Sequence, residues 1–429
     1  MALKINLKLD PIILQKYHTL RLVYVIVLLA GPISFAQNKT DSIPKLGSPD
    51  QVENRIQLDK IVESEVFQFN FLQPYFTFKD SLYSKSGFNF ATDYNSAYFG
   101  SSSDQGVGDA SSGIWRIYGN WDLVGRNTKN SGALVFKVEH RHRYSEIPPK
   151  TLGLDMGYVG FIAAPFNNDG FRATNLYWRQ RMAQGRVSMV VGFLDVTDFF
   201  DVYGLASPFM HFTNLAFSTG AAAVNLPNDG YLGIGVAGWI TDRIYAIAGL
   251  GDINSDPTRI FKGFDTFFSE NEYFKHVEIG ITSSKDYLLL DNIHLSFWQR
   301  DTTSATGDPN GWGLVFSASK YIQEKYFPFL RYAYTKDAGS LLQNSISTGF
   351  GYQPNQGKSL VAIGFNWGQV NETTFGEGLD DQYTLELFYR IQLSERLAVT
   401  PDIQWLINPA LNQQNSSVFI WGVRGRLAL

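Results

Sequence analysis

The side chains in this sequence that could do chemistry include a pair of histidines on a predicted strand. His140 and His142 lie two positions apart, directly after Glu139, so this stretch offers ligands of the kind that bind zinc. On a strand, both histidines project from one face and Glu139 projects from the other. A metal site would need a third ligand on the histidine face, and the sequence supplies no candidate for it. We therefore interpret the two histidines as residues at the end of a strand.

Three regularly spaced aspartates form a second such stretch. Asp195, Asp198 and Asp201 in VGFLDVTDFFD are spaced like calcium ligands, but the stretch lacks the glycine and the terminal glutamate of an EF-hand loop. No nucleophile motif supports a Ser/His/Asp triad. The chain has no cysteine, which excludes disulfides and thiolate metal sites. The sequence therefore predicts a protein that is not an enzyme and needs no cofactor or metal.

The elements that must position these side chains are long strands with one apolar face. The stretch from Asp381 to Leu429 reads as a hairpin followed by one closing strand. In the closing strand, Phe419, Trp421 and Val423 share one face, whereas Arg424 and Arg426 share the other. Alternation with a period of two over about 10–13 residues indicates a half-apolar strand. Three such strands in a row, each longer than usual, favour a membrane barrel over a soluble sandwich.

The composition of the chain agrees with a closed all-β sheet. Aromatic residues make up 15% of the 429 residues, 39 residues are glycine, and only 18% are charged. The formal charge is −4, and residues 1–36 contribute a net of +3, so the remainder carries −7. This negative charge argues against a nucleic-acid partner.

Residues 1–36 are predicted to be a cleaved secretory signal peptide. Lys16 and Arg21 precede the apolar run Leu22 to Leu29, and Ser34-Phe35-Ala36 resembles a cleavage site. The apolar run is too short to cross a bilayer core about 30 Å thick, which needs about 20 residues. We therefore expect an exported protein located in the cell outer membrane.

The rest of the chain is predicted to form two parts. Residues 37–79 read as a periplasmic, partly flexible N-terminal leader, in which Ser48-Pro49-Asp50 could start a short helix through about Ile61. The Phe-rich run Phe67 to Phe78 could be a short first strand or a pad against the barrel. Residues 80–429 are predicted to form the outer-membrane barrel.

Connections between the predicted strands alternate between short turns and long loops. The turns 125–130 and 183–185 are short, whereas the connections 145–170 and 196–230 are long. This asymmetry is typical of transmembrane antiparallel β-barrels with short periplasmic turns, long extracellular loops and an even number of strands. We count about 16 strands, and eighteen if two segments within the long connections are also strands.

Alternation also assigns the side chains that face the inside of the barrel. A sixteen-stranded barrel is wide enough for an aqueous channel. Its arginines and carboxylates suit polyhydroxylated solutes, because they supply hydrogen-bond donors and acceptors, and a tryptophan offers a face to the C–H surface of a sugar. The candidate pore-lining residues are Arg116, Lys137, Glu139, Arg141, Arg179, Arg181, Trp298, Arg300, Arg331, Glu386, Arg390, Asp402 and Arg424.

Two other interpretations of these charges stay open. They could solvate a pore and pair with each other, or an arginine-lined path could favour small anions. For the whole protein, the leading hypothesis is a channel for the passive diffusion of sugars. The alternatives are a general or anion-preferring diffusion porin, an outer-membrane barrel enzyme, and a surface protein with an occluded lumen.

Several short motifs resemble the carbohydrate-selective porin family (OprB). They are Gln180, the Gly192 to Asp195 stretch, Phe212 to Asn214, Thr400-Pro401-Asp402-x-Gln404, Asn408-Pro409 and Val423-Arg424. The resemblance covers roughly residues 80–429. It implies a barrel that passes mono- and oligosaccharides by diffusion, with loops such as 196–230 folded into the pore around an Arg-rich constriction. The chain departs from the family in ending at Leu429 instead of Phe. The expected partners are outer-membrane lipid and sugar solutes, in a monomer or homotrimer.

Overall fold

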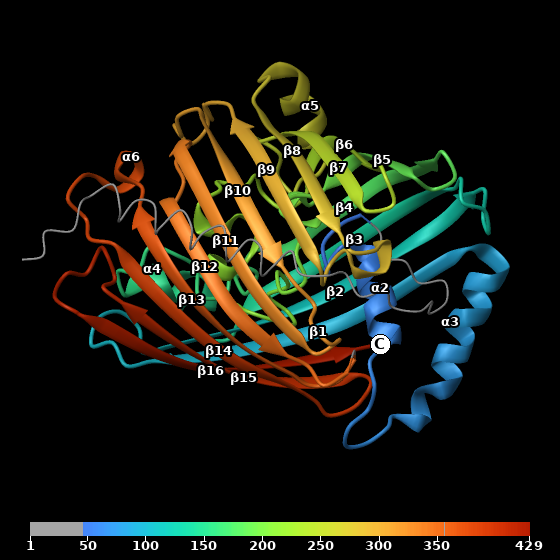
Figure 1. Cartoon of the computed structure of the whole chain (residues 1–429), viewed down its shortest axis with the longest axis horizontal. Helices are drawn as coiled ribbons and strands as arrows, with labels where there is room; N and C mark the ends of the chain where they lie inside the picture. Colours follow the sequence, from blue (N-terminus) through green and yellow to red (C-terminus); the bar gives the residue numbers. More distant parts are fainter. Residues whose placement is uncertain (1–45, 356) are drawn as a thin grey trace, which may run out of the picture. The chain divides into compact units, whose positions relative to one another are not determined.

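The computed structural model describes residues 46–355 and 357–429, so the predicted signal peptide lies outside the described residues. Within them, sixteen antiparallel strands close into a barrel, in which β1 pairs with β16 (Figure 1). Closure leaves no sheet edge with unpaired backbone groups, as a bilayer core requires. The predicted count of sixteen strands is confirmed. The alternative of eighteen is wrong, because residues 151–164 and 208–218 form short helical turns and irregular chain.

The strands and helices follow one another along the chain in a simple up-and-down order. The strands are β1 (Phe88–Ser101), β2 (Asp109–Val124), β3 (Gly132–Arg143), β4 (Gly170–Met182), β5 (Val187–Leu194), β6 (Tyr231–Trp239), β7 (Ile244–Asp252), β8 (Tyr273–Thr282), β9 (Asn292–Arg300), β10 (Gly311–Ser319), β11 (Tyr326–Asp337), β12 (Leu342–Tyr352), β13 (Leu360–Val370), β14 (Gln382–Gln392), β15 (Leu397–Ile407) and β16 (Ser417–Ala428). The helices are α2 (Val52–Lys60), η1 (Asn70–Leu72), α3 (Gln73–Ser86), α4 (Pro149–Asp155), η2 (Val196–Asp198), η3 (Leu215–Phe217), η4 (Thr219–Ala222), α5 (Lys262–Ser269), η5 (Lys285–Tyr287) and α6 (Glu372–Phe375). No helix among the described residues is long and apolar enough to cross a membrane.

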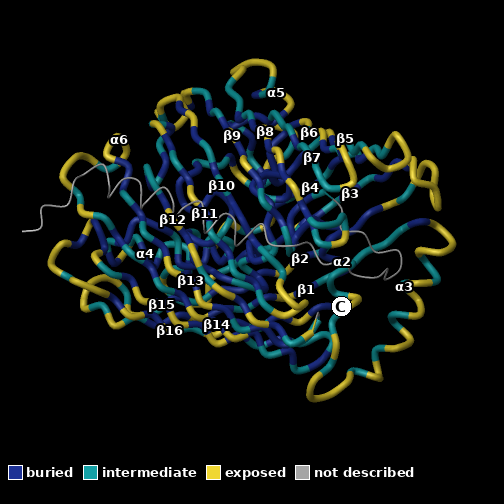
Figure 2. The backbone as a smooth tube through the Cα atoms, in the orientation of Figure 1, coloured by how far each residue is buried: buried dark blue, intermediate teal, exposed yellow. Residues whose placement is uncertain are grey.

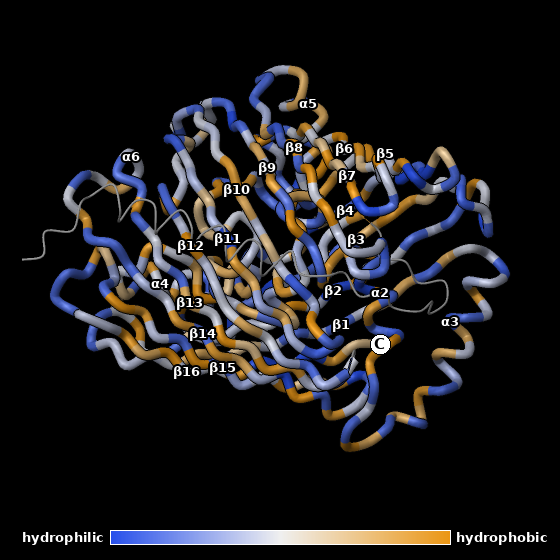
Figure 3. The backbone as a smooth tube through the Cα atoms, in the orientation of Figure 1, coloured by the Kyte–Doolittle hydropathy of each residue, from blue (hydrophilic) through white to orange (hydrophobic). Residues whose placement is uncertain are grey.

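The strands carry the two faces that alternation predicted. Along β14 to β16, outward side chains such as Tyr389, Trp405 and Trp421 are exposed, whereas inward ones such as Gln404 are buried. Buried and exposed residues alternate along the strands in Figure 2, and Figure 3 shows the matching alternation of polar and apolar residues. Phe388, which breaks the polar pattern of its strand, faces inward and is buried. The outward apolar surface is the one that contacts lipid.

The connections are mostly longer at one end of the barrel than at the other, although 102–108, at the long-loop end, is no longer than the turn 125–131. The turns 125–131 and 183–186 lie at the short-turn end, and the loops 144–169 and 195–230 lie at the long-loop end. The connection 338–341 between β11 and β12 is short although it lies at the long-loop end. In porin-type barrels the short-turn end faces the periplasm.

The N-terminal segment forms helices. Helix α2 begins four residues after Ser48, and its residues Val52 to Ile56 are buried. The Phe-rich run forms η1 and the start of α3 instead of a strand. Helix α3 crosses the predicted boundary at residue 80 and ends at Gly87, whose φ of 75° favours glycine. This turn directs the chain into β1.

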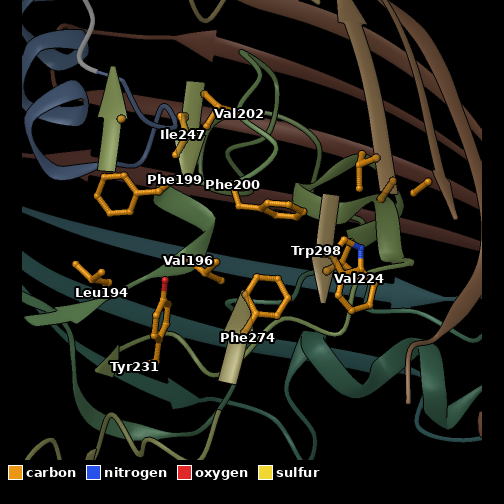
Figure 4. Packing of buried hydrophobic residues seen from close by; sticks show 14 of the residues in the cluster. Leu194, Val196, Phe199, Phe200, Val202, Val224, Tyr231, Ile247, Phe274 and Trp298 are labelled. Carbon is orange, nitrogen blue, oxygen red and sulfur yellow. The ribbon is translucent and has the colours of Figure 1, made fainter. Parts of the chain in front are cut away.

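Two long loops fold into the barrel and carry an apolar cluster. Phe199, Phe200 and Val202 of the loop 195–230 are buried together with Phe274 and Trp298 of the wall (Figure 4). The lumen is therefore less polar than its wall charges predicted. Small inward residues make room for large neighbours: a Cβ at the position of Gly249 would lie 2.3 Å from the His276 ring, and one at Gly280 would lie 2.4 Å from the Tyr245 ring.

Candidate pore-lining site

The structure places the thirteen candidate residues on inward-facing strand positions, but not around one open ring. Twelve of them are less than a tenth exposed, and only the Arg181 side chain, at 19%, is more accessible. Helix α2 and the loops 144–169 and 195–230 lie against them. The candidates consequently separate into several groups, in which most charges pair with inserted chain.

The first group holds helix α2 against the wall. Asp59 on α2 accepts hydrogen bonds from Arg55 at 2.9 Å and from Arg426 at 2.8 Å. Burial opposes ionisation of Asp59, but Arg426 and Arg55 outweigh it and hold the pKa of this carboxyl well below its usual range. Arg426 also bonds Asp93 at 2.9 Å, and Asp93 accepts two bonds from Arg116 at 2.8 and 2.6 Å. This network is a continuous set of buried ion pairs.

The same helix contacts the wall on its other side. Glu53 accepts a hydrogen bond from Arg179 at 3.0 Å and one from Arg181 at 2.9 Å. Gln51 donates to the Tyr177 hydroxyl at 3.3 Å. Helix α2 is thus fixed by polar contacts to two sectors of the wall, one at β16 to β2 and one at β4.

The second group joins the start of the loop 195–230 to the chain before α2. Lys137 lies 3.4 Å from Asp195 and 3.6 Å from Asp198. Asp198 also accepts hydrogen bonds from Asn175 at 3.1 Å and from the Ser48 hydroxyl at 3.2 Å. Burial raises the pKa of Asp198 to about 7, with Lys137 opposing and Asp195 adding to the shift.

Replacing Asp198 with Asn is expected to remove part of the pH dependence of stability. Between about pH 4 and pH 7 the folded protein holds a proton that an unfolded aspartate has released, so the free energy of unfolding falls as pH rises across this range. Below about pH 4 the contribution is fully present, because both states are protonated. Urea unfolding in liposomes at pH 5 and pH 8 measures the difference. Asp242→Asn, at an exposed ion pair, is the control and should keep the wild-type pH dependence; equal behaviour of the two variants would refute the assignment.

The third group is centred on Asp201, on the same loop. This carboxylate binds Arg331 directly, and its other oxygen lies 3.0 Å from His294 Nε2. The Asp201 backbone N–H donates to Glu278 at 2.7 Å, and Arg331 donates to the Ser218 carbonyl at 2.7 Å. Asp201 and Arg331 are fully buried. The loop is therefore fastened to β8, β9 and β11.

The fourth group fastens the far part of this loop to β14 and β15. Glu386 accepts hydrogen bonds from the backbone N–H groups of Thr213 at 2.6 Å and Asn214 at 3.0 Å. Asn214 donates to Gln404 at 3.0 Å, and its side-chain oxygen accepts a bond from Tyr158 of the loop 144–169 at 3.2 Å. The two inserted loops are thus tied to one another and to the wall.

Next to this anchor lie two arginines that have few acidic partners. Arg390 donates to the backbone carbonyls of Lys358 at 3.2 Å and Met210 at 3.5 Å, and no carboxylate of residues 46–355 or 357–429 lies within ion-pair distance. Arg424 lies 3.7 Å from Asp402. The Nε atoms of both arginines are buried without a hydrogen-bond acceptor in the described structure. Both arginines therefore keep a hydrogen-bond donor that no described residue uses.

His211 completes this cluster from the inserted loop. Its Nε2 lies 3.4 Å from Arg390, and its carbonyl accepts a bond from Arg424 at 2.5 Å. Burial, reinforced by Arg390, Arg55 and Arg424, lowers the pKa of His211 well below its usual range. The imidazole is therefore neutral and offers one donor and one acceptor. We name Arg390, Arg424 and His211 the arginine cluster.

The remaining candidates lie nearer the long-loop end and have other partners. Arg141 binds Glu139 and Asp229, each at 2.5 Å. Arg300 donates to Thr303 at 2.9 Å. Trp298 is fully buried and stacks on Phe274 with a centroid distance of 5.8 Å. Its ring is covered by the apolar cluster.

The residues that could have bound a metal are not assembled as a metal site. His140 and His142 lie side by side on the outer face, with their Nδ1 atoms 3.2 Å apart, near Tyr94 and Tyr144. Asp195 and Asp198 share Lys137 as a partner, and Asp201 pairs with Arg331. No group of three metal-ligating side chains occurs among the residues that the structure describes.

Sequence reasoning missed the residues that the inserted segments contribute. Asp59 and Glu53 carry no motif, and His211 lies in a loop that alternation does not assign to a face. The sequence of α2 held one indication of its position. Its apolar residues do not form a stripe along one face, whereas a helix on a protein surface usually has such a stripe. A helix without one needs charged partners, and the wall supplies them.

The closed sixteen-stranded sheet with inserted loops has the architecture of porin-type barrels. A structure of Pseudomonas putida OprB at high pH matches 85% of this chain and 99% of its own with a TM-score of 0.66 and 13% identity. A mutant of Rh. blastica porin matches 80% of this chain and 100% of its own with a TM-score of 0.52 and 12% identity. These likenesses show the fold. No curated protein matches the chain.

The family resemblance is confirmed over the C-terminal part of the chain. Residues 295–429 match the model of the carbohydrate-selective porin, OprB family. This match covers β10 to β16, which carry Glu386 and the two arginines of the arginine cluster. Over this part the chain is thus similar to carbohydrate-selective porins, and the whole barrel shares the fold of a solved OprB structure.

Proposed function

We propose that this porin passes carbohydrates across the outer membrane by passive diffusion, and that solutes are selected at the arginine cluster. The observation that carries the proposal is the pair of buried Nε donors on Arg390 and Arg424, which have no acceptor among residues 46–355 and 357–429. Vicinal hydroxyls of a sugar accept such paired donors. The other candidate side chains mostly hold the inserted segments in place.

Two features of the whole chain belong to the same proposal. We infer that residues 1–36 are removed on export and that the leader 37–79 belongs to the periplasmic end of the barrel, where β1 begins, with its helix α2 reaching into the barrel. We also propose that one chain forms a complete channel, as a monomer or within a homotrimer, because a single chain closes the barrel.

Replacing Arg390 with Gln tests the proposal most directly. Arg390 makes no ion pair within the described residues, so its loss leaves no buried carboxylate without a partner. We expect the maltose concentration that half-blocks ion current in planar bilayers to rise about tenfold, which corresponds to about 1.4 kcal/mol and one lost charge-assisted bond. Arg126→Gln, an exposed arginine of a short turn, is the matched control.

Three outcomes of this experiment are informative. Block that weakens only in Arg390→Gln supports a sugar-selective cluster. Block that is unchanged in Arg390→Gln removes this residue from the path. Absence of sugar block in the wild type, together with a reversal potential that shows anion preference, would support the alternative of an anion-preferring porin, which the unpaired arginines also suit.

A further inference from the structure

A second polar site lies at the short-turn end of the barrel, away from the arginine cluster. It is a cavity of about 360 Å³ between helix α2 and the wall at β2 to β9. This volume falls within the range of small-molecule sites. Its lining includes five basic side chains, Lys129, Arg179, Arg181, Arg186 and Lys285.

The basic side chains of this cavity outnumber the carboxylates near them. Glu53 bonds Arg179 and Arg181 at 3.0 and 2.9 Å, and Asp122 lies 3.1 Å from Arg179. Asp242, which is 79% exposed, pairs with Arg186 and Lys285 at 3.5 and 2.9 Å. Lys129 has no ion pair among the described residues. Five cations thus face three carboxylates, which leaves a local excess of positive charge.

One donor in this cavity is buried and unused. Arg179 is 2% exposed, and its Nε atom has no hydrogen-bond acceptor in the described structure. Its two terminal nitrogens are committed to Ser131 at 3.0 Å and to Glu53 and Asp122. A buried N–H without an acceptor is costly, so an acceptor supplied by a ligand would be favourable.

The cavity also has an apolar side. Trp239, Phe199 and Val190 line it, and the Lys285 ammonium lies over the Trp239 ring at 5.4 Å from the centroid. An aromatic and aliphatic wall beside several basic groups matches a small molecule that has a C–H face and a negative charge. A neutral sugar would use the wall but leave the excess positive charge unpaired.

We propose that this cavity binds monosaccharides that carry a carboxylate, at the periplasmic exit of the channel. The proposal rests on the proposed function, because the solute must first pass the barrel, and it names an acidic subset of that solute class. The carboxylate pairs with Lys129 and Arg181, whose side chains are the more accessible of the five, and the ring lies toward Trp239.

Binding of glucuronate and of glucose to the full-length protein separates the effect of charge from that of shape. The two sugars differ at one carbon, which is a carboxylate in the first and a hydroxymethyl group in the second. In calorimetric titrations of detergent-solubilised protein, we expect glucuronate to bind at least tenfold more tightly than glucose, a ratio that corresponds to about 1.4 kcal/mol. Equal affinities would overturn the proposal.

The double variant Lys129→Gln/Arg181→Gln is expected to lose this preference. Lys325→Gln is the control, since Lys325 is exposed in a turn at the same end and does not line the cavity. If the double variant and Lys325→Gln lose the preference for glucuronate equally, the preference comes from the general positive potential at this end of the barrel, and the cavity is not a binding site. The block of ion current by glucose should stay unchanged in the double variant, because this block measures sugar binding at the arginine cluster. Failure of the proposed site in this cavity and failure of the proposed function therefore give different results. Each variant counts as folded if heating shifts its mobility in an SDS gel as much as it shifts that of the wild type.

Discussion

Deletion of residues 46–60 is expected to raise the single-channel conductance of the protein several-fold. This segment contains helix α2, which is buried inside the barrel and contacts the wall on two sides. Its interface combines ion pairs with the buried side chains of Val52 and Ile56, so removing it exposes both charged groups and some apolar surface to water. A wider aqueous path through the barrel carries more ions.

The barrel should survive this deletion, because the wall keeps partners for the charges that α2 leaves. Arg426 retains Asp93 at 2.7 Å, and Arg179 retains Asp122 at 3.1 Å. The deletion therefore strands neither arginine as an isolated buried charge, which would be strongly destabilising.

Planar-bilayer recordings of the deleted and intact proteins measure the effect. Asp59→Asn is an intermediate variant, in which α2 loses its strongest attachment to Arg426 but remains on the chain; we expect its current to fluctuate between two levels. Asp242→Asn, at an exposed ion pair, should behave as the wild type. If the deletion leaves the conductance unchanged, helix α2 does not obstruct the path.

The fold could be predicted from the sequence because its signal is local. Period-two alternation is a property of neighbouring residues, so Trp421 and Arg424 could be assigned to opposite faces without knowing which strands pair. Closure of the sheet into a barrel could also be predicted, because an open sheet edge in a bilayer would leave backbone N–H and C=O groups unpaired. The lengths of most connections distinguished the two ends of the barrel, although the short connections from β1 to β2 and from β11 to β12 lie at the long-loop end.

The candidate site could be predicted only in part, because its partners come from far along the chain. Alternation placed Arg331 and Glu386 on the inner face, but Asp201 and Thr213 reach them from a loop whose conformation is set by the packing of Phe200 and its neighbours. The Asp59 contact with Arg426 joins residues at opposite ends of the chain. Trp298 was assigned to an open pore because its inward direction was known and its covering by the apolar cluster was not.

The most destabilising single change is expected at Asp201. Asp201→Asn removes the charge that neutralises Arg331, and both side chains are fully buried. Breaking one partner of a buried ion pair costs about 3–5 kcal/mol, because the remaining charge stays out of water. Asn is the appropriate substitution, since Asp201 has a φ of 51° and Asn also tolerates the left-handed conformation. Backbone strain therefore does not contribute to the result.

Urea unfolding in liposomes, with hydrogen exchange of residues 196–230, distinguishes loss of this anchor from a general weakening of the barrel. We expect Asp201→Asn to lower the free energy of unfolding and to increase exchange in the loop before the strands exchange. Asp256→Asn, which breaks an ion pair with the 70% exposed Arg259, should cost less than about 1 kcal/mol. The double variant Asp201→Asn/Arg331→Met should recover part of the loss, because it leaves no unpaired buried charge. Equal stability of Asp201→Asn and Asp256→Asn would show that the loop is held in the barrel by its apolar contacts, and that the buried ion pair contributes only to its position.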